Sequence, residues 1–206
     1  MINKYDKTFI SAIIAGICIS IGGTCYLSLD NKVVGAFMFS LGLLTICSNE
    51  FHLFTGKVCF ARKWDDYLNL LLIWIGNLVG CGIVGFAVKY TRPQLIQKAV
   101  ELCNVKMTEK WWMIIILGIF CNILIFFAVN NFKETTKKEK VMLLIMCVMA
   151  FILCGFEHCV ANMFYFIVSG VPDSTRYILL NTVGNAAGGL SIGLICERLK
   201  AKNEHI

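Results

Sequence analysis

Long apolar runs separated by clusters of charge restrict the folds that this chain can adopt. Six apolar segments can be drawn, at residues 8–29, 33–60, 67–88, 111–129, 141–169 and 177–196. A helix needs about 20 apolar residues to cross a hydrocarbon layer of about 30 Å. Only 16% of the residues are charged, well below the roughly 25% typical of soluble domains. We therefore predict an all-α polytopic membrane protein with six transmembrane helices in one domain, residues 1–206.

Lysine and arginine are divided unevenly between the two sides that six spans would create. One side carries more of them (Lys4, Lys7, Arg62, Lys63, Lys133, Lys137, Lys138, Lys140, Arg198, Lys200 and Lys202) than the other (Lys32, Lys89, Arg92, Lys98, Lys106, Lys110 and Arg176). Because cytoplasmic loops are enriched in these residues, both termini are predicted to be cytoplasmic in the plasma membrane. This topology explains the net charge of +6 without a nucleic-acid partner. The first apolar run is interpreted as a retained span, not a signal peptide.

The second and fifth segments are too long for one simple span, and each has polar residues at mid-depth. These residues lie at 48–52 (Ser-Asn-Glu-Phe-His) and at 155–158 (Gly-Phe-Glu-His). Non-helical backbone is tolerated at this depth only where protein or a water-filled cavity satisfies its polar groups. We therefore expect the second and fifth helices to be broken at these places.

A matching phrase follows each break, which indicates that the two halves of the chain are repeats. Gly-Asn-Leu-Val-Gly at 76–80 corresponds to Gly-Asn-Ala-Ala-Gly at 184–188, 108 positions later. Because three spans per half is an odd number, the repeats, about 8–90 and about 108–198, are predicted to be inverted. Paired broken helices in inverted repeats indicate a transport pathway at the repeat interface. Glycines four residues apart are interpreted as sites of close helix packing.

The eleven cysteines lie almost entirely within apolar segments, and no Cys-x-x-Cys pair is present. Free cysteine in such a setting behaves as a small hydrophobic residue. We interpret the cysteines as packing residues, and predict neither a metal site nor a cofactor.

Three phrases carry a family resemblance: Leu-Phe-Thr-Gly at 53–56, Gly-Phe-Glu-His-Cys-Val-Ala-Asn-Met-Phe at 155–164, and Gly-Asn at 184–185. They are similar to the formate/nitrite transporter family, and the second phrase matches that family's broken fifth helix almost residue for residue. The resemblance covers nearly the whole chain. It implies an aquaporin-like fold and a homopentamer. Each protomer would hold its own pore for a small monovalent anion or weak acid, such as formate, nitrite or hydrosulfide.

The resemblance also assigns residues to the pore. His158 resembles the family's central histidine, Thr55 the threonine that faces it, and Asn122 a nearby asparagine of the fourth helix. Lys106 resembles a vestibule lysine that attracts anions. The apolar constrictions would be formed by Leu53, Phe54, Phe39, Leu43, Ile125 and Phe151.

These residue types suit the transport of small anions. A bare anion at the centre of a bilayer is costly, and apolar rings obstruct it by dewetting. Lys106 on the outer side would concentrate anions by Coulomb attraction, most strongly at low salt. His158 has a reference pKa of about 6.5 and is predicted to protonate an entering base. Glu157 is predicted to orient the helix break, or to accept from backbone N–H groups, without touching the permeant.

Two positions depart from the family pattern. The family usually has Asp or Glu directly before the Leu-Phe-Thr stretch, whereas this chain has His52 there and Glu50 two residues earlier. Lys57 replaces the commoner asparagine after Thr-Gly. These departures leave substrate preference and gating at the cytoplasmic mouth open.

Other functions are compatible with a polytopic chain. One alternative is a membrane-embedded enzyme or redox protein that uses the cluster Glu157-His158-Cys159, although adjacent residues of a helix point in different directions. Another is a scaffold with an inert pore, against which His158 argues. Channel and proton-coupled carrier cannot be separated by sequence.

Overall fold

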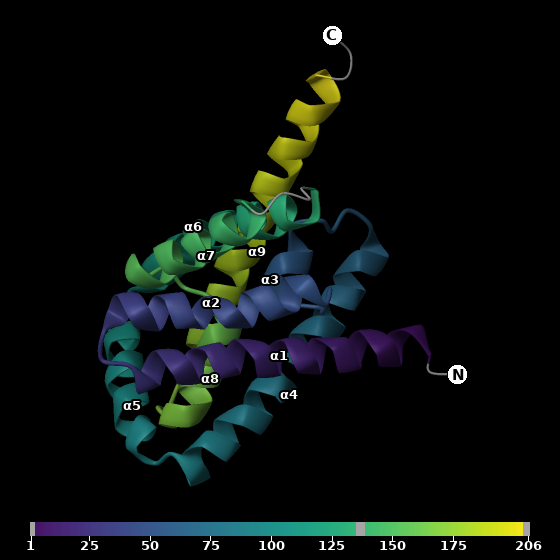
Figure 1. Cartoon of the computed structure of the whole chain (residues 1–206). Coiled ribbons are helices and arrows are strands. Elements are labelled where there is room, and N and C mark those ends of the chain that lie inside the picture. Colours follow the sequence, from purple (N-terminus) through teal and green to yellow (C-terminus); the bar gives the residue numbers. More distant parts are fainter. Residues whose placement is uncertain (1–2, 135–138, 204–206) are drawn as a thin grey trace.

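The computed structural model of the protein describes residues 3–134 and 139–203, which form nine helices (Figure 1). In chain order these are α1 (Lys4–Ser28), α2 (Lys32–Ser48), α3 (Phe54–Val58), α4 (Trp64–Thr91), α5 (Gln94–Met107), α6 (Trp111–Glu134), α7 (Glu139–Leu153), α8 (Cys159–Ser169) and α9 (Ser174–Asn203). Lys137 and Lys138, which entered the predicted topology, lie outside the described residues, as does the side chain of Lys202.

Four of these helices, α1, α4, α6 and α9, are long and apolar enough to cross a membrane, and α2 and α8 are shorter apolar helices. Large apolar side chains lie on the outside of the protomer, among them Phe37, Leu71, Phe86 and Phe120. Such a surface suits lipid and not water. The prediction of an all-α membrane protein agrees with this architecture.

Two breaks interrupt the apolar segments where the polar phrases predicted them. Helix α2 ends at Ser48 and α3 begins at Phe54, and between them Glu50 has a φ of 57°. Helix α7 ends before Gly155, whose φ is 68°, and α8 begins at Cys159. Glycine adopts this left-handed conformation without the steric cost of a Cβ atom. The break between α7 and α8 therefore has a residue suited to ending the helix.

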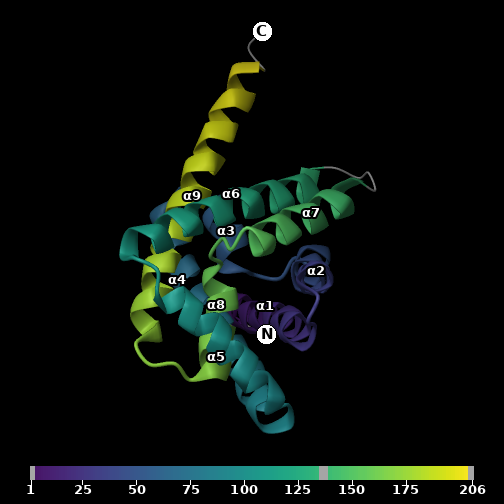
Figure 2. The same cartoon turned by 90° about the vertical axis from the view of Figure 1, so that its left-hand side faces the viewer.

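The helices pair in the same way in the two halves of the chain. Helix α1 packs against α2 and α4, and α6 packs against α7 and α9, while α2 contacts α7 between the halves. Figure 2 shows α6 and α7 side by side, and α1 nearly end-on beside α2. The C-terminal part of α9 extends beyond the other helices (Figure 1).

Glycines allow the long helices to approach backbone to backbone. A Cβ atom on Gly80 would lie 2.1 Å from the Ile13 carbonyl oxygen, and one on Gly188 would lie 2.4 Å from that of Ile119. Neither glycine has room for a side chain. The predicted packing role of the glycines four residues apart is confirmed at these positions.

Helix α5 was not predicted as a separate helix. It has only 14 residues, and it buries one face through Leu95, Ala99 and Cys103, while polar residues such as Gln97 and Glu101 are exposed. It packs against α8 and carries Lys106 in its last turn. This helix thus brings a lysine from the connection between the two halves to the broken helix of the second half.

Candidate functional site

One buried asparagine holds the break between α2 and α3. The Nδ2 of Asn77 in α4 donates to the carbonyl oxygens of Ala12 at 2.8 Å and His52 at 3.0 Å. Its Oδ1 accepts from the backbone N–H of Phe54 at 2.9 Å. The first N–H groups of a helix have no partner within the helix. Asn77 therefore satisfies backbone groups on both sides of the break.

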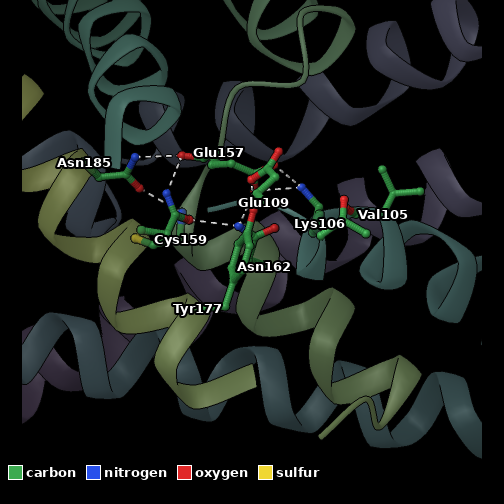
Figure 3. A network of polar contacts seen from close by, with 10 residues as sticks. Val105, Lys106, Glu109, Glu157, Cys159, Asn162, Tyr177 and Asn185 are labelled. Carbon is green, nitrogen blue, oxygen red and sulfur yellow. Dashed lines mark hydrogen bonds and ion pairs between the residues drawn. The ribbon is translucent and has the colours of Figure 1, made fainter. Parts of the chain in front are cut away.

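Asn185 of α9 does the same for the break between α7 and α8. Its Nδ2 donates to the carbonyl oxygens of Gly118 and Glu157, each at 2.8 Å, and its Oδ1 accepts from the N–H of Cys159 at 2.8 Å. Figure 3 shows Asn185 beside Glu157 and Cys159. Asn181 donates a second hydrogen bond to the Glu157 carbonyl oxygen at 2.8 Å. The backbone of this break is therefore fixed by side chains of α9.

The two breaks bring His158 and Thr55 together, as the resemblance predicted. The Nε2 of His158 lies 2.9 Å from the Thr55 Oγ1, and both residues are buried. The Nδ1 of His158 accepts from the N–H of Ala161 at 3.1 Å, which caps α8. Since an accepting Nδ1 carries no proton, the neutral ring has its proton on Nε2 and donates it to Thr55. The Thr55 hydroxyl then keeps its own proton to donate elsewhere.

Asn122 of α6 lies against the first turn of α3. Its Nδ2 donates to the Thr55 carbonyl oxygen at 3.1 Å and lies 3.4 Å from the Cys59 Sγ. Within the described residues its buried Oδ1 has no hydrogen-bond partner. Buried polar atoms are usually satisfied, so this oxygen is an acceptor without a protein partner in residues 3–134 and 139–203, although Asn122 is in the lining of neither cavity described below.

Glu157 forms a buried ion pair that sequence reasoning did not predict. Its carboxylate accepts from the Nζ of Lys106 at 2.5 and 2.7 Å and from the Nδ2 of Asn162 at 2.6 Å. Figure 3 shows these groups converging from α5 and α8. The side chain of Lys106 is 13% exposed and that of Glu157 is 2% exposed. Lys106 was expected to face the outer mouth as a free cation, and the structure places its charge against a carboxylate.

Two cavities approach the His158–Thr55 pair. One, which we call the Lys57 vestibule, has a volume of about 560 Å³ and is lined by Leu43, Ile46, Cys47, Ser48, Glu50, Phe51, His52, Leu53, Gly56, Lys57, Val129, Phe132, Lys133 and Lys140. The other, the Lys106 vestibule, has a volume of about 240 Å³ and includes His158, Lys106, Phe39 and Phe151 in its lining.

The predicted constriction residues are distributed between these cavities. Leu43 and Leu53 line the Lys57 vestibule. Phe39 and Phe151 line the Lys106 vestibule, with their rings edge to face and their centroids 6.0 Å apart. The Phe151 ring also stacks on His158 at 5.7 Å.

The two remaining constriction residues lie elsewhere. Phe54 and Ile125 are buried. Among the described residues they are part of neither vestibule lining. The structure therefore brings four of the six predicted constriction residues to the cavities.

The asparagines of the breaks were not given a role from sequence. Asn77, Asn162, Asn181 and Asn185 are all buried within apolar helices. A signal was present, because an amide in an apolar helix needs a hydrogen-bond partner, and Asn77 and Asn185 stand in the matching phrases. The partner backbone groups could not be named without the fold.

Known proteins resemble this chain over most of its length. Residues 2–197 match the family model described as formate/nitrite transporter. A formate channel of Haemophilus influenzae is 28% identical over 76% of this chain and 64% of its own length. The nitrite transporter of Escherichia coli is 25% identical over 90% of this chain and 76% of its own length.

Solved structures also resemble this chain over most of its length. A pentameric formate channel with formate bound has a TM-score of 0.83 and 27% identity, with 96% of this chain and 97% of that chain covered. A structure described as an FNT family ion channel shares the fold, with a TM-score of 0.81 and 24% identity over 95% of this chain and 89% of that chain. The chain spans slightly less than two thirds of the length of the formate channel from Haemophilus influenzae.

Proposed function

Because this chain belongs to the formate/nitrite transporter family, we propose that it is a membrane channel or proton-linked transporter for small monovalent anions or their conjugate acids. Formate, nitrite and hydrosulfide are the candidate substrates. The observation that carries the proposal is the buried hydrogen bond between His158 and Thr55, next to the cavities that approach the centre of the protomer. The family comprises channels and transporters, not enzymes. In this chain, moreover, Glu157 and His158 have separate partners, Lys106 and Thr55.

The proposed architecture is aquaporin-like, with two inverted three-helix repeats at about 8–90 and 108–198. It is supported by the parallel hydrogen bonds of Asn77 and Asn185 and by the matching helix pairs. Both termini are proposed to be cytoplasmic. The pentameric assembly of the formate channel that shares the fold supports a homopentamer in the lipid bilayer.

The proposed pathway runs from one vestibule to the other past the central pair. From the Lys57 vestibule it passes Leu43 and Leu53, then the Thr55 hydroxyl and His158, and then Phe151 with its neighbouring Phe39. Apolar rings of this kind obstruct hydrated ions by dewetting. A neutral acid crosses them at a lower free-energy cost than its anion does. The pathway therefore favours permeants that can exchange a proton.

The hydrogen bonds at His158 set the conditions for proton exchange. In the neutral ring, Nδ1 accepts from Ala161 and Nε2 donates to Thr55. The Thr55 hydroxyl can then donate its proton to an oxygen or sulfur atom of the permeant. The imidazolium form, which can release a proton, needs a proton on Nδ1 and must therefore give up the hydrogen bond from Ala161. The free Oδ1 of Asn122 is suited to accept from the O–H of a neutral acid.

The vestibule lysine has a different setting from the one that sequence suggested. Lys106 is proposed to face the outer side. There it would attract anions only weakly, because Glu157 largely offsets its charge. The same ion pair joins α5 to the break before α8, so Lys106 also positions Glu157 and the residues that follow it. Flux measurements at varied salt distinguish the two contributions.

Uptake into proteoliposomes tests the proposed function. Formate, nitrite, hydrosulfide, acetate and chloride are compared at several pH values for the wild type, His158→Asn and His52→Asn. Asn retains a side-chain acceptor for the cap of α8 but cannot deliver a proton near neutral pH. We expect His158→Asn to lose pH-dependent uptake of the weak acids while the protein still assembles.

His52→Asn is the matched control, because His52 lies in the Lys57 vestibule and not at the central pair. It should retain the pH profile of the wild type. Wild-type rates with an unchanged pH profile in His158→Asn would show that His158 is structural and that the proposed mechanism is wrong.

A further inference from the structure

The Lys57 vestibule collects three lysines from three different helices. Lys57 comes from α3, Lys133 from the end of α6 and Lys140 from the first turn of α7. Glu50 is the single carboxylate among the described residues of the lining. The cavity therefore carries an excess of positive charge at one mouth of the proposed pore.

Aromatic rings hold two of these lysines. The Nζ of Lys133 lies 4.1 Å from the centre of the Phe60 ring, and that of Lys140 lies 4.5 Å from the centre of the Phe132 ring. A cation–π contact positions an ammonium group without cancelling its charge, as a carboxylate would. The two ammonium groups are therefore held in place with their charges available.

The three lysines of the Lys57 vestibule also differ from Lys106 in their ionic partners. Within residues 3–134 and 139–203, none of the three forms an ion pair, whereas Lys106 pairs with Glu157. Lys57 lies close enough to Lys133 to experience its charge. An anion between like charges relieves their repulsion, and the gain increases with the charge of the anion.

Two leucines of this cavity obstruct the passage of the same anions that the lysines attract most strongly. Leu43 and Leu53 form part of the lining and are buried, each with 1% exposure. Removing an ion from water costs a free energy that increases steeply with its charge. A dianion would therefore bind in the vestibule but would not pass the leucines. The volume of about 560 Å³ also exceeds what an anion of three or four atoms requires.

We propose that the Lys57 vestibule is a binding site for small polyvalent oxyanions, of the phosphate, pyrophosphate or dicarboxylate type, which block the pore from this side. Lys57, Lys133 and Lys140 bind the ligand, and Leu43 and Leu53 keep it from moving further. The blocking effect rests on the proposed transport function. The binding itself does not.

Binding is tested on the purified full chain in detergent by calorimetric titration with inorganic pyrophosphate. The test variant is K57Q/K133Q/K140Q. The control variant, K89Q/K98Q/K110Q, removes the same charge from residues outside this vestibule. We expect the test variant to lose affinity by at least about tenfold, which corresponds to about 1.4 kcal/mol, and the control to bind as the wild type does.

A charge-retaining variant, K57R/K133R/K140R, separates loss of charge from loss of folding, and it should still bind pyrophosphate. Equal affinity in the wild type and the glutamine variant would overturn the proposal. Absence of pyrophosphate binding to the wild type would overturn it as well.

A second measurement tests the block. Formate uptake into proteoliposomes is followed with pyrophosphate on both sides of the membrane, at constant ionic strength. Inhibition in the wild type that is relieved in K57Q/K133Q/K140Q supports the proposal, and equal inhibition of both proteins contradicts the block. If the wild type transports none of the anions, the proposed function fails, while the titration still decides whether the site exists.

Discussion

Asn77 and Asn185 make the same three hydrogen bonds in the two halves of the chain. Each Oδ1 accepts from the first N–H of the helix that follows a break, at Phe54 or Cys159. Each Nδ2 donates to the carbonyl oxygen two residues before that N–H, and to a carbonyl oxygen of a neighbouring long helix. In both halves of the chain, the polar backbone groups of the helix break are therefore satisfied by one buried asparagine in the same way.

Removal of either asparagine is expected to destabilise the protein strongly. Asn77→Ala or Asn185→Ala removes three buried hydrogen bonds and leaves the N–H of Phe54 or Cys159 without its partner, and a buried unsatisfied group costs about 1–3 kcal/mol. We expect each variant to melt well below the wild type in detergent. Asn131→Ala is the control, because Asn131 donates to the Phe127 carbonyl oxygen at an exposed site of α6. Equal melting temperatures for all three variants would contradict the role of the two asparagines.

Much of the fold could be predicted because each span is a long run of apolar residues and each break places polar residues in the middle of such a run. Helix α5 was not predicted because it is short and amphipathic, so it is neither a long apolar run nor a polar interruption of one. The partner of Lys106 also escaped, since Glu157 is 51 positions away in the sequence. Such a contact depends on how α5 packs against α8, which residue spacing does not encode. The pairing of Thr55 with His158 was available only through the family resemblance.

Thr55 offers a test of the central hydrogen bond. Thr55→Ser keeps the hydroxyl that lies 2.9 Å from the His158 Nε2, whereas Thr55→Val has nearly the same shape without it. Loss of the partner leaves the buried imidazole N–H unsatisfied, at a cost of about 1–3 kcal/mol. We expect Thr55→Val to reduce uptake at least about tenfold if that cost appears in the barrier, and Thr55→Ser to retain most of it. Similar uptake in the two variants would show that the hydroxyl has no part in permeation.

The buried ion pair predicts coupling between Lys106 and Glu157. Breaking a buried pair by removing one partner typically costs about 3–5 kcal/mol, and the partial exposure of Lys106 reduces this figure. We expect Lys106→Gln and Glu157→Gln each to lower the melting temperature, and the double variant to lose less than the sum of the two. Additive losses would mean that the pair contributes no coupling energy.

Salt dependence separates the two sets of lysines. Because Glu157 offsets the charge of Lys106, removing both charges in Lys106→Gln/Glu157→Gln leaves the local net charge unchanged, and the flux lost in this double variant should change little with ionic strength. The flux lost in Lys57→Gln should instead decrease as salt rises, since attraction by an unpaired charge is screened over about 8 Å at physiological ionic strength. A stronger salt dependence for Lys106→Gln/Glu157→Gln than for Lys57→Gln would contradict the idea that Glu157 offsets the charge of Lys106.

Two glycines of α4 provide a matched test of helix packing. A Cβ atom on Gly80 would lie 2.1 Å from the Ile13 carbonyl oxygen, whereas one on Gly82 would meet nothing within 4 Å. Gly80→Ala must therefore push α1 and α4 apart and is expected to cost about 1–3 kcal/mol, the usual range for overpacking. Gly82→Ala removes a helix-interior glycine without a clash, so it should be neutral or slightly stabilising in the protomer. The melting temperatures of the two variants in detergent decide between these outcomes, and an equal effect would contradict the close packing of α1 against α4.

Glu109 predicts a pH dependence of stability outside the membrane spans. It lies between α5 and α6, and its carboxylate accepts from the Tyr177 hydroxyl at 2.7 Å. Burial raises the pKa of Glu109 above its ordinary value of 4.5, and the hydrogen bond from Tyr177 partly opposes this shift. A carboxyl group whose pKa is raised by folding binds protons more tightly in the folded state, so it stabilises the protein as pH falls and loses this contribution as pH rises through the folded pKa.

Glu109→Gln keeps an acceptor for Tyr177 but does not titrate. The wild type should therefore gain stability relative to Glu109→Gln between neutral pH and about pH 4.5, measured as the difference in melting temperature in detergent, and a constant difference over this range would show that Glu109 titrates normally.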